Sequence, residues 1–300
     1  MSPCPLVSVR REANERSSTF ESEVVTCEFA DRTQRRLLLK YAALLDGDHR
    51  GYGMTSGPAY EALVYSKLLR NRIRPAFYGF QSSRNGVQWI ALEFIQGAVL
   101  LRHAQDEDAF LRAAAWLGRF HAAQEQRLAS SRPAGIRVYD VEFFRGWVRR
   151  TREFAGAWCQ SDPWLTNLGA NFDSVIEALV ESAPTLVHGD FYAQNILYRG
   201  GEIFPVDWET AAIGAGEIDL VAFSEGWPEA DVRRFAGEYR AARWPAEPPA
   251  LFERALAAAH IFTHVRWMGD HPGWTSDQDE VQWRLAGLQQ WAARFAEAAP

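Results

Sequence analysis

One polar segment constrains this chain more than any other, because it carries acidic and amide side chains at fixed spacing between short strand-forming runs. It reads His188-Gly189-Asp190-Phe191-Tyr192-Ala193-Gln194-Asn195. The apolar runs Leu186-Val187 and Ile196-Leu197-Tyr198 flank it, and a Gly200-Gly201 turn leads into Ile203-Phe204-Pro205-Val206. This pattern predicts a small hairpin next to a polar loop.

The spacing within that loop suits phosphoryl transfer. Asp190 and Asn195 stand five residues apart, the Asp-to-Asn spacing of a kinase catalytic loop. Transfer of a phosphoryl group needs a carboxylate to orient the attacking hydroxyl, and an oxygen ligand for Mg²⁺ close by. Asp207, just after the last of these strand-forming runs, supplies another carboxylate. One Asp, one Asn and the phosphates of a nucleotide suffice as ligands for Mg²⁺. A lone Asp-x4-Asn would equally suit a capping turn, but the ordered set favours catalysis.

The rest of the chain has two characters. Strand patterns cover residues 23–29, 36–41, 77–80 and 87–95, with a helical pattern over 58–70. Helices are predicted over residues 108–126, 143–158, 172–181, 229–243, 249–268 and 279–299. We therefore predict an α+β protein with a strand-rich first part, residues 1–96, and a mostly helical second part, residues 97–300.

Composition excludes several classes of protein. The net charge of −6 argues against nucleic acid as the main partner. No apolar run approaches the roughly 18 to 20 residues needed to cross a bilayer. Residues 1–16 lack the apolar run of a secretory signal. The three cysteines, Cys4, Cys27 and Cys159, lie far apart in no metal-binding pattern, which predicts a reduced, cytoplasmic protein.

Charge is unevenly distributed. Residues 1–97 hold 13 Lys/Arg and 10 Asp/Glu, so 32 − 13 = 19 basic and 38 − 10 = 28 acidic residues remain in the second part. An acidic second part would attract a cationic substrate, although a solvated acidic surface is the alternative. Only Lys40 and Lys67 are lysines, which suggests that a compact ammonium group is needed where they occur.

The motif His188-Gly189-Asp190-x4-Asn195, followed by Asp207-Trp208-Glu209 and Ile218-Asp219-Leu220, resembles the aminoglycoside phosphotransferase and choline kinase family. The resemblance implies the bilobal protein-kinase-like fold. It also implies transfer of the γ-phosphate of ATP or GTP to a hydroxyl of a small molecule. In this reading Asp190 is the catalytic base, and Asn195 and Asp207 hold Mg²⁺.

The resemblance extends to supporting residues of the same motif. Asp219 would brace the catalytic loop, and His188 would orient it. Glu209 matches an acidic position of the family and is a tentative substrate contact. Leu117 to His121 resembles the end of a helix in the family, with Phe120 in place of a leucine, and His121 is expected to be a core histidine rather than a catalytic one.

The first part of the chain matches the nucleotide-binding half of the family. Lys40, at the end of the Leu37-Leu38-Leu39 run, would contact the phosphates and pair with Glu61. The backbone of Glu93 and Ile95 would bind the base between the lobes. The phosphate loop departs from the family because no glycine precedes Gly47, and the hydroxyl residues Ser17, Ser18 and Thr19 stand there instead.

In the family the C-terminal helices wall the acceptor pocket, so His264, Trp267, Asp270 and Trp274 are tentative substrate contacts. Core packing is the alternative for each. The acceptor classes implied are aminoglycosides, macrolides, amino alcohols such as choline, homoserine and sugars. The sequence does not indicate an oligomeric state.

Two rival functions remain open. A pseudokinase would explain the missing glycines, but it has no need of Lys40, Asp190, Asn195 and Asp207 together. A protein kinase is disfavoured by the His-Gly-Asp form and by the tryptophan-rich helical part.

Replacing Asp190 by Asn is expected to abolish turnover, because the attacking hydroxyl loses its proton acceptor, while nucleotide binding persists. Initial rates and nucleotide titrations of the Asp190→Asn variant measure both quantities. Normal turnover of this variant would refute the role of Asp190.

Overall fold

The computed structural model describes residues 4–14, 20–42, 57–69, 75–156, 158–270 and 273–298. The chain forms two compact units. The first contains the described residues up to Ala104 together with Ala193–Thr210, and the second contains Gln105–Tyr192 and the described residues from Ala211 onward. The chain therefore passes from one unit to the other inside the predicted catalytic loop.

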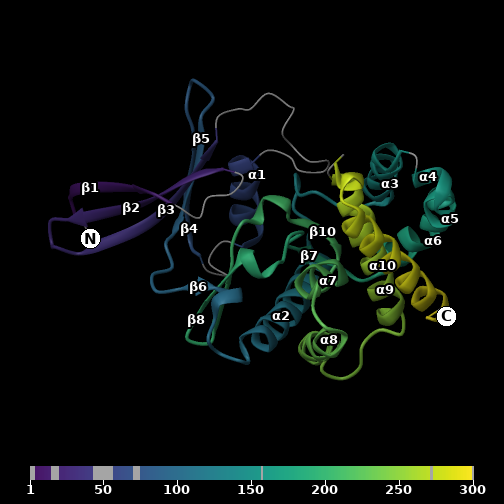
Figure 1. The fold of residues 1–300 in the computed structure, drawn as a ribbon. Coiled ribbons are helices and arrows are strands. Elements are labelled where there is room, and N and C mark those ends of the chain that lie inside the picture. Colours follow the sequence, from purple (N-terminus) through teal and green to yellow (C-terminus); the bar gives the residue numbers. More distant parts are fainter. Residues whose placement is uncertain are drawn as a thin grey trace. The chain divides into compact units, whose positions relative to one another are not determined.

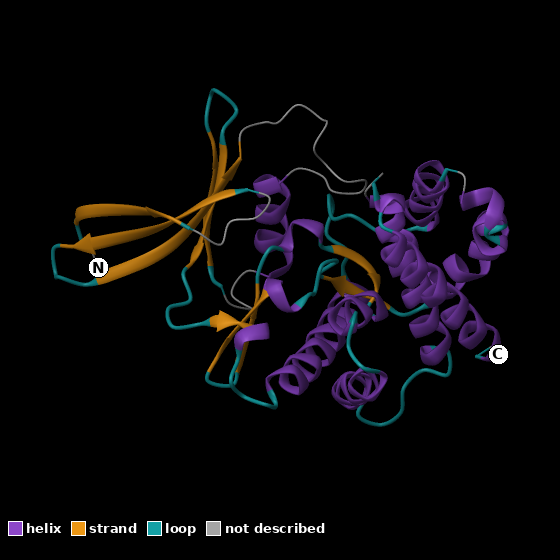
Figure 2. Cartoon of the chain, viewed as in Figure 1, coloured by secondary structure: helices purple, strands orange, loops and turns teal. Residues whose placement is uncertain are grey.

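The first unit is built on a five-stranded antiparallel sheet, drawn in orange in Figure 2. Its strands lie in the order β1-β2-β3-β5-β4 (Figure 1). Their bounds are β1 Leu6–Ala13, β2 Glu21–Phe29, β3 Gln34–Ala42, β4 Phe77–Ser82 and β5 Gln88–Glu93. The turn between β2 and β3 is closed by Asp31, whose Oδ1 accepts hydrogen bonds from the amide and the hydroxyl of Thr33, at 3.0 and 2.6 Å.

Helix α1, Gly57–Val64, packs against this sheet and continues as the short π-helix Tyr65–Leu69. Glu61, Val64, Tyr65 and Leu68 are almost fully buried. Their spacing places them on one face of the helix, as the sequence pattern predicted.

A second, three-stranded sheet completes the first unit. Its strands are β6 Val99–Leu100, β8 Ile196–Arg199 and β9 Glu202–Pro205, followed by the 3₁₀ turn η5, Trp208–Thr210. Gly200 and Gly201 form the tight turn of the β8–β9 hairpin with φ of 54° and 90°, a conformation that favours glycine. Pairing of Ile196 with Pro205 brings the residue before β8 and the residues after β9 to the same end of the hairpin.

The second unit is mostly helical, as Figure 2 shows in purple. One small sheet pairs β7, Pro184–Val187, with β10, Ala212–Ala215. The helices are α2 Ala109–Ser130, α3 Val141–Ala155, α4 Trp158–Ser161, α5 Pro163–Thr166, α6 Leu168–Glu181, α7 Glu217–Ser224, α8 Glu229–Arg243, α9 Phe252–Asp270 and α10 Gln278–Glu297.

Helix α9 is the centre of the second unit and contacts α3, α6, α7 and α10. Its side chains are buried on most sides, among them Ala258, Phe262 and Val265. The Phe262 ring meets the Phe144 ring edge-on at 4.9 Å between centroids. Each large apolar side chain buried in this way contributes about 1.5–3 kcal/mol.

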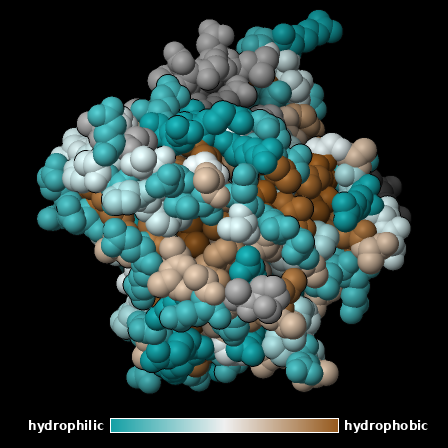
Figure 3. Space-filling model, turned by 90° about the vertical axis from the view of Figure 1, so that its right-hand side faces the viewer, coloured by the Kyte–Doolittle hydropathy of each residue, from teal (hydrophilic) through white to brown (hydrophobic). Residues whose placement is uncertain are grey.

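The face of the molecule that lies at the right of Figure 1 is mostly hydrophilic, with patches of apolar side chains (Figure 3). No helix in the described ranges is long and apolar enough to cross a membrane.

The predicted α+β class, with a strand-rich first part and a helical second part, is confirmed. The sequence analysis missed β6, α4 and α5, which are short, and also β1, α7 and β10. Strand β1 is exposed along its whole length and lacks an apolar alternation, helix α7 is short and buried throughout, and β10 depends on pairing with β7. The sequence analysis divided the chain at residue 96 and did not predict that Ala193–Thr210 belongs to the first unit. In that unit β8 pairs with β6, a strand that is distant in sequence.

Gly118 allows α2 and α8 to approach closely, since a Cβ at this position would lie 2.4 Å from the Tyr239 carbonyl oxygen. We expect Gly118→Ala to lower the free energy of unfolding by about 1–3 kcal/mol, because the backbone must move apart. The matched control is Gly237→Ala on α8, where a new Cβ meets nothing within 4 Å. That variant should keep or gain stability, by up to about 1 kcal/mol. Equal urea-denaturation midpoints for the two variants would contradict the close approach.

Candidate active site

The first unit buries an ammonium group among three carboxylates. Lys40 lies on β3, between Ser22 of β2 and Ile90 of β5, and is 9% exposed. Its Nζ lies 3.1 Å from Glu61 Oε2 and 3.4 Å from Glu209 Oε2, and it also forms an ion pair with Asp207 Oδ1. The structure therefore contains the Lys40–Glu61 pair that the family resemblance implied.

The charges in this cluster do not balance. Burial alone would lower the pKa of Lys40, but the charges of Glu61, Asp207 and Glu209 outweigh it and raise the pKa, so the ammonium stays protonated. Burial raises the pKa of Glu61 and raises that of Glu209 to about 8. Three carboxylates share one ammonium, and the raised pKa values of Glu61 and Glu209 show that the cluster disfavours ionising all of them together. A further cation beside the cluster would favour their ionised forms.

Glu61 is fixed by a backbone contact as well as by Lys40. The amide of Trp208 donates to Glu61 Oε1 at 3.2 Å, and the Trp208 indole donates to the Pro205 carbonyl at 3.2 Å. Because Trp208 is fully buried, it ties α1 to the segment that carries Asp207 and Glu209. Glu209, interpreted from the sequence as a tentative substrate contact, is instead buried beside Lys40 and is 6% exposed.

Asn195 and Asp207 share one end of the β8–β9 hairpin. The Val206 amide donates to the Asn195 carbonyl at 2.9 Å, which fixes the two segments next to each other. Asp207 has a φ of 69°, a backbone conformation that is uncommon outside glycine and concentrates at functional sites.

The oxygen donors at this hairpin end fit Mg²⁺. A carboxylate and an amide are ligands that Mg²⁺ prefers, and the surplus of carboxyl groups over ammonium groups around Lys40 favours a cation. The described residues contain no group of three or more His, Cys, Asp or Glu side chains that could hold a metal. Magnesium, which keeps several waters and binds substrate phosphates, does not require such a group. Asn195 and Asp207 are the residues that would hold it.

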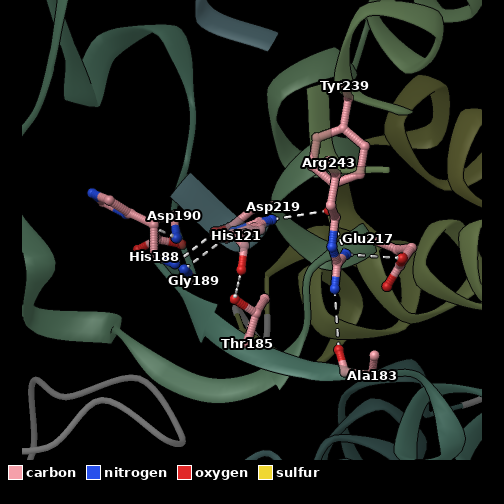
Figure 4. A network of polar contacts seen from close by, with 10 residues as sticks. All are labelled: His121, Ala183, Thr185, His188, Gly189, Asp190, Glu217, Asp219, Tyr239 and Arg243. Atoms are coloured by element: carbon pink, nitrogen blue, oxygen red, sulfur yellow. Dashed lines mark hydrogen bonds and ion pairs between the residues drawn. The ribbon is translucent and has the colours of Figure 1, made fainter. Parts of the chain in front are cut away.

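The second unit carries Asp190 on a loop held through its backbone. The amides of His188 and Gly189 donate to the two carboxylate oxygens of Asp219 at 2.6 and 2.8 Å, as Figure 4 shows. Gly189 adopts a φ of 84°, open to glycine without strain. The Asp190 amide donates to the His188 ring at 3.3 Å. Asp219 and His188 thus lie where they can brace and orient the loop.

Asp219 is itself positioned by a buried relay (Figure 4). His121 Nε2 lies 3.2 Å from Asp219 Oδ2, and His121 Nδ1 lies 2.9 Å from the Tyr239 hydroxyl. Arg243 donates to that hydroxyl at 2.6 Å, so the hydroxyl proton is left to donate to Nδ1. Burial lowers the pKa of His121, which keeps it neutral with its proton on Nε2, facing Asp219.

Arg266 on α9 is a site residue that the sequence analysis missed. Its guanidinium donates to Asp190 Oδ1 at 2.5 Å and to the Gly189 carbonyl at 2.6 Å. No local pattern marks it, because it lies 76 residues beyond Asp190 in sequence.

The tentative acceptor contacts lie in different surroundings. His264 is buried against Trp283 and Gly287, and it lines a cavity of about 970 Å³ walled by α8, α9 and α10. Trp267 is 38% exposed, and its indole donates to Glu225 at 3.0 Å. Asp270 ends α9 and is partly exposed, and the side chain of Trp274 lies outside the described residues.

The structure describes only some of the other residues that the sequence predicts to contact a nucleotide. Glu93 ends β5, where its amide donates to the Ala76 carbonyl at 2.8 Å. Ile95 follows with a buried side chain. Ser17, Ser18 and Thr19 lie outside the described residues, so the glycine-free loop stays a prediction.

Comparison with known proteins agrees with this geometry. The model of the phosphotransferase enzyme family matches residues 65–252, which is more than half of the chain. The chain belongs to the phosphotransferase enzyme family. No curated protein sequence shows significant similarity to it.

Several solved structures share the fold of this chain. A choline kinase from Cryptosporidium parvum Iowa II has a TM-score of 0.59 at 14% identity, with 96% of this chain and 89% of that one covered. An aminoglycoside 2′-phosphotransferase-IIIa with GDP has a TM-score of 0.59 at 18% identity, with 96% and 93% covered. A spectinomycin phosphotransferase with ADP and spectinomycin has a TM-score of 0.55 at 13% identity, with 98% and 94% covered. Identities this low establish the protein-kinase-like fold and no more.

His264 should make stability depend on pH. Burial first, and then the charge of Arg284, lower its pKa to about 4, against about 6.5 in the unfolded chain. The unfolded state therefore binds the proton more readily, and the stabilisation, complete above about pH 6.5, is lost as pH falls toward 4. We expect the stability advantage of the wild type over His264→Gln to shrink by about 2 kcal/mol between pH 7 and pH 5. Urea unfolding at both pH values measures it, and an unchanged difference would contradict the burial of a neutral imidazole.

Proposed function

We propose that this protein is a Mg²⁺-dependent kinase that transfers the γ-phosphate of ATP or GTP to a hydroxyl group of a small molecule. One observation carries the proposal: a buried lysine is paired with the α1 glutamate and with the aspartate that ends the β8–β9 hairpin. A lysine placed in this way can bind nucleotide phosphates. The intact ion pairs also speak against a scaffold without chemistry.

Chain connectivity limits the distance between the proposed base and one proposed metal ligand. Asp190 and Asn195 are five residues apart, so their Cα atoms lie within about 18 Å of each other in any conformation. We propose that both residues act on one substrate complex.

The reaction follows from the residues described. Asp190 orients the acceptor hydroxyl and receives its proton. The acceptor oxygen forms a bond to the γ-phosphorus, while the bond from that phosphorus to the bridging oxygen breaks and the nucleoside diphosphate leaves. Lys40 stabilises the charge on the phosphates, and a Mg²⁺ ion held by Asn195 and Asp207 would supply further charge neutralisation. Positioning and charge stabilisation account for most of the rate in this reaction class.

Structural neighbours support a nucleotide but leave its base open. One neighbour was solved with GDP and another with ADP. We propose that Glu93 and Ile95 bind the base through their backbone and that Ser17, Ser18 and Thr19 contact phosphate. Among the described residues, Cys4 and Cys27 are free thiols. This agrees with the proposal that the protein acts in a reducing compartment.

The acceptor is proposed to be a small hydroxyl compound, with an amine-bearing one favoured by the acidic second part of the chain. Names of neighbours in the family include a choline kinase and a spectinomycin phosphotransferase. Trp267 and Asp270 stay tentative contacts for it. A panel of amino alcohols, aminoglycosides, macrolides and sugars, scored by ³¹P NMR for a phosphorylated product, tests the proposal. Consumption of nucleotide with protein substrates alone would favour a protein kinase instead.

Lys40→Met is expected to weaken binding of a nucleoside triphosphate by about 10- to 100-fold, because a charged contact to phosphate is lost. The chain offers a matched control, since its other lysine, Lys67, is exposed on the π-helix after α1. Lys67→Met should bind as the wild type does. Isothermal titration calorimetry measures both constants, with circular dichroism to confirm folding. Equal losses in the two variants would exclude Lys40 from the nucleotide site.

A further inference from the structure

The predicted base is held by a residue from the far end of the chain. Arg266 NH2 donates to Asp190 Oδ1 at 2.5 Å, and Arg266 NH1 donates to the carbonyl of the preceding residue, Gly189, at 2.6 Å. Two nitrogens of one planar group therefore bind one side chain and one backbone oxygen of the same loop. A fork of this kind fixes direction as well as distance.

The part of α9 that presents Arg266 is anchored on its other side. Thr151 of α3 donates its hydroxyl to the Val265 carbonyl at 2.6 Å, and Arg150 Nε donates to the Gly269 carbonyl at 2.9 Å. Bonds from α3 on both sides of Arg266 in sequence hold this turn of the helix in place. A guanidinium on a fixed support restrains the group that it binds.

The Arg266 charge is permanent in this environment. Burial would lower the pKa of Arg266, but the charge of Asp190 leads the groups that outweigh it and raise the pKa. The side chain is 20% accessible and that of Asp190 is 22% accessible, so water does not fully screen the pair.

We propose that Arg266 is a positioning residue for phosphoryl transfer, holding the Asp190 carboxylate in the direction in which it meets the acceptor hydroxyl. This inference rests on the proposed function. Asp219 fixes the backbone of the loop through the amides of His188 and Gly189. Arg266 fixes the side chain of the base, so the two supports act on different parts of the loop.

The alternative is that Arg266 only stabilises the fold. The two roles differ in what a substitution changes, since a structural arginine alters stability and total activity without a specific effect on kcat. Arg145 provides the matched control, because it is an exposed arginine of α3 that pairs with Asp173 of α6 at 3.2 Å.

The first test compares Arg266→Met, Arg266→Lys and Arg145→Met with the wild type, using an acceptor that the wild type phosphorylates. We expect Arg266→Met to lower kcat about 100-fold, the effect of a misplaced reacting group, with nucleotide KM changed less than threefold. Arg266→Lys, which keeps the charge but not the fork, should fall between Arg266→Met and the wild type. Arg145→Met should keep kcat within about twofold. Equal kcat values for Arg266→Met and the wild type would overturn the proposal.

The second test asks whether Arg266 acts through Asp190. Guanidinium at tens of millimolar should restore kcat of Arg266→Ala at least tenfold, whereas equal urea should not. Any trace of turnover left in Asp190→Asn should fall no further when Arg266→Met is added, because the carboxylate partner is already lost. Additive effects of the two substitutions on the rate, or a rescue by urea equal to that by guanidinium, would overturn the proposal.

The outcomes separate this inference from the proposed function. If the wild type phosphorylates no acceptor, the function fails, and the wild type, Asp190→Asn, Arg266→Met and the double variant are then compared by thermal unfolding. If the two substitutions lower the melting temperature by less together than the sum of their separate effects, the contact between the two side chains is supported. Additive effects would reject that contact. If the wild type turns over and Arg266→Met equals it, the inference alone fails.

Discussion

A single buried ammonium group organises the first unit of this protein. Lys40 comes from the sheet, Glu61 from α1, and Asp207 and Glu209 from the segment after the β8–β9 hairpin, and all meet at one point. Removing the ammonium would leave three carboxylates facing one another in a buried place, at a cost of several kcal/mol. The charge requirement therefore holds together elements that lie about 170 residues apart in sequence.

A second buried network organises the loop that carries Asp190. Asp219 accepts two backbone amides of the loop and faces His121, which in turn lies against Tyr239 and Arg243. Gly216 makes the relay possible, since a Cβ there would lie within 2.7 Å of the side chains of Arg243, His121 and Tyr239. Buried networks of this kind specify a geometry when every member has a partner. The loop direction is thus set by buried residues that lie outside the loop.

Short motifs carried most of the predictable information. The Asp190-x4-Asn195 spacing and the Gly200-Gly201 turn are local, so the hairpin and the chemistry could be inferred from the sequence. The pairing of Lys40 with Glu61 came from family resemblance, because no local pattern joins a strand to a helix 21 residues later. Arg266 could not be inferred at all, since its role depends on where α9 packs.

Features that depend on packing between distant segments could not be predicted from the sequence. Glu209 is two residues from Asp207, and the sequence could not indicate on which side of the chain it would point. Its burial beside Lys40 is decided by the packing of α1 against the 3₁₀ turn Trp208–Thr210. Strand β1 was missed because it is an edge strand with exposed side chains, and α7 because a fully buried helix shows no periodicity.

The most direct test of the account is electron paramagnetic resonance of Mn²⁺ in place of Mg²⁺, with a β,γ-imido analogue of ATP or GTP. We predict that the wild type removes the free Mn²⁺ signal only when the nucleotide is present. Asp207→Asn should weaken this binding at least about tenfold, while Asp173→Asn, an exposed carboxylate on α6, should not. Equal Mn²⁺ binding by the wild type and Asp207→Asn would contradict the assignment of the hairpin end as the metal–nucleotide site.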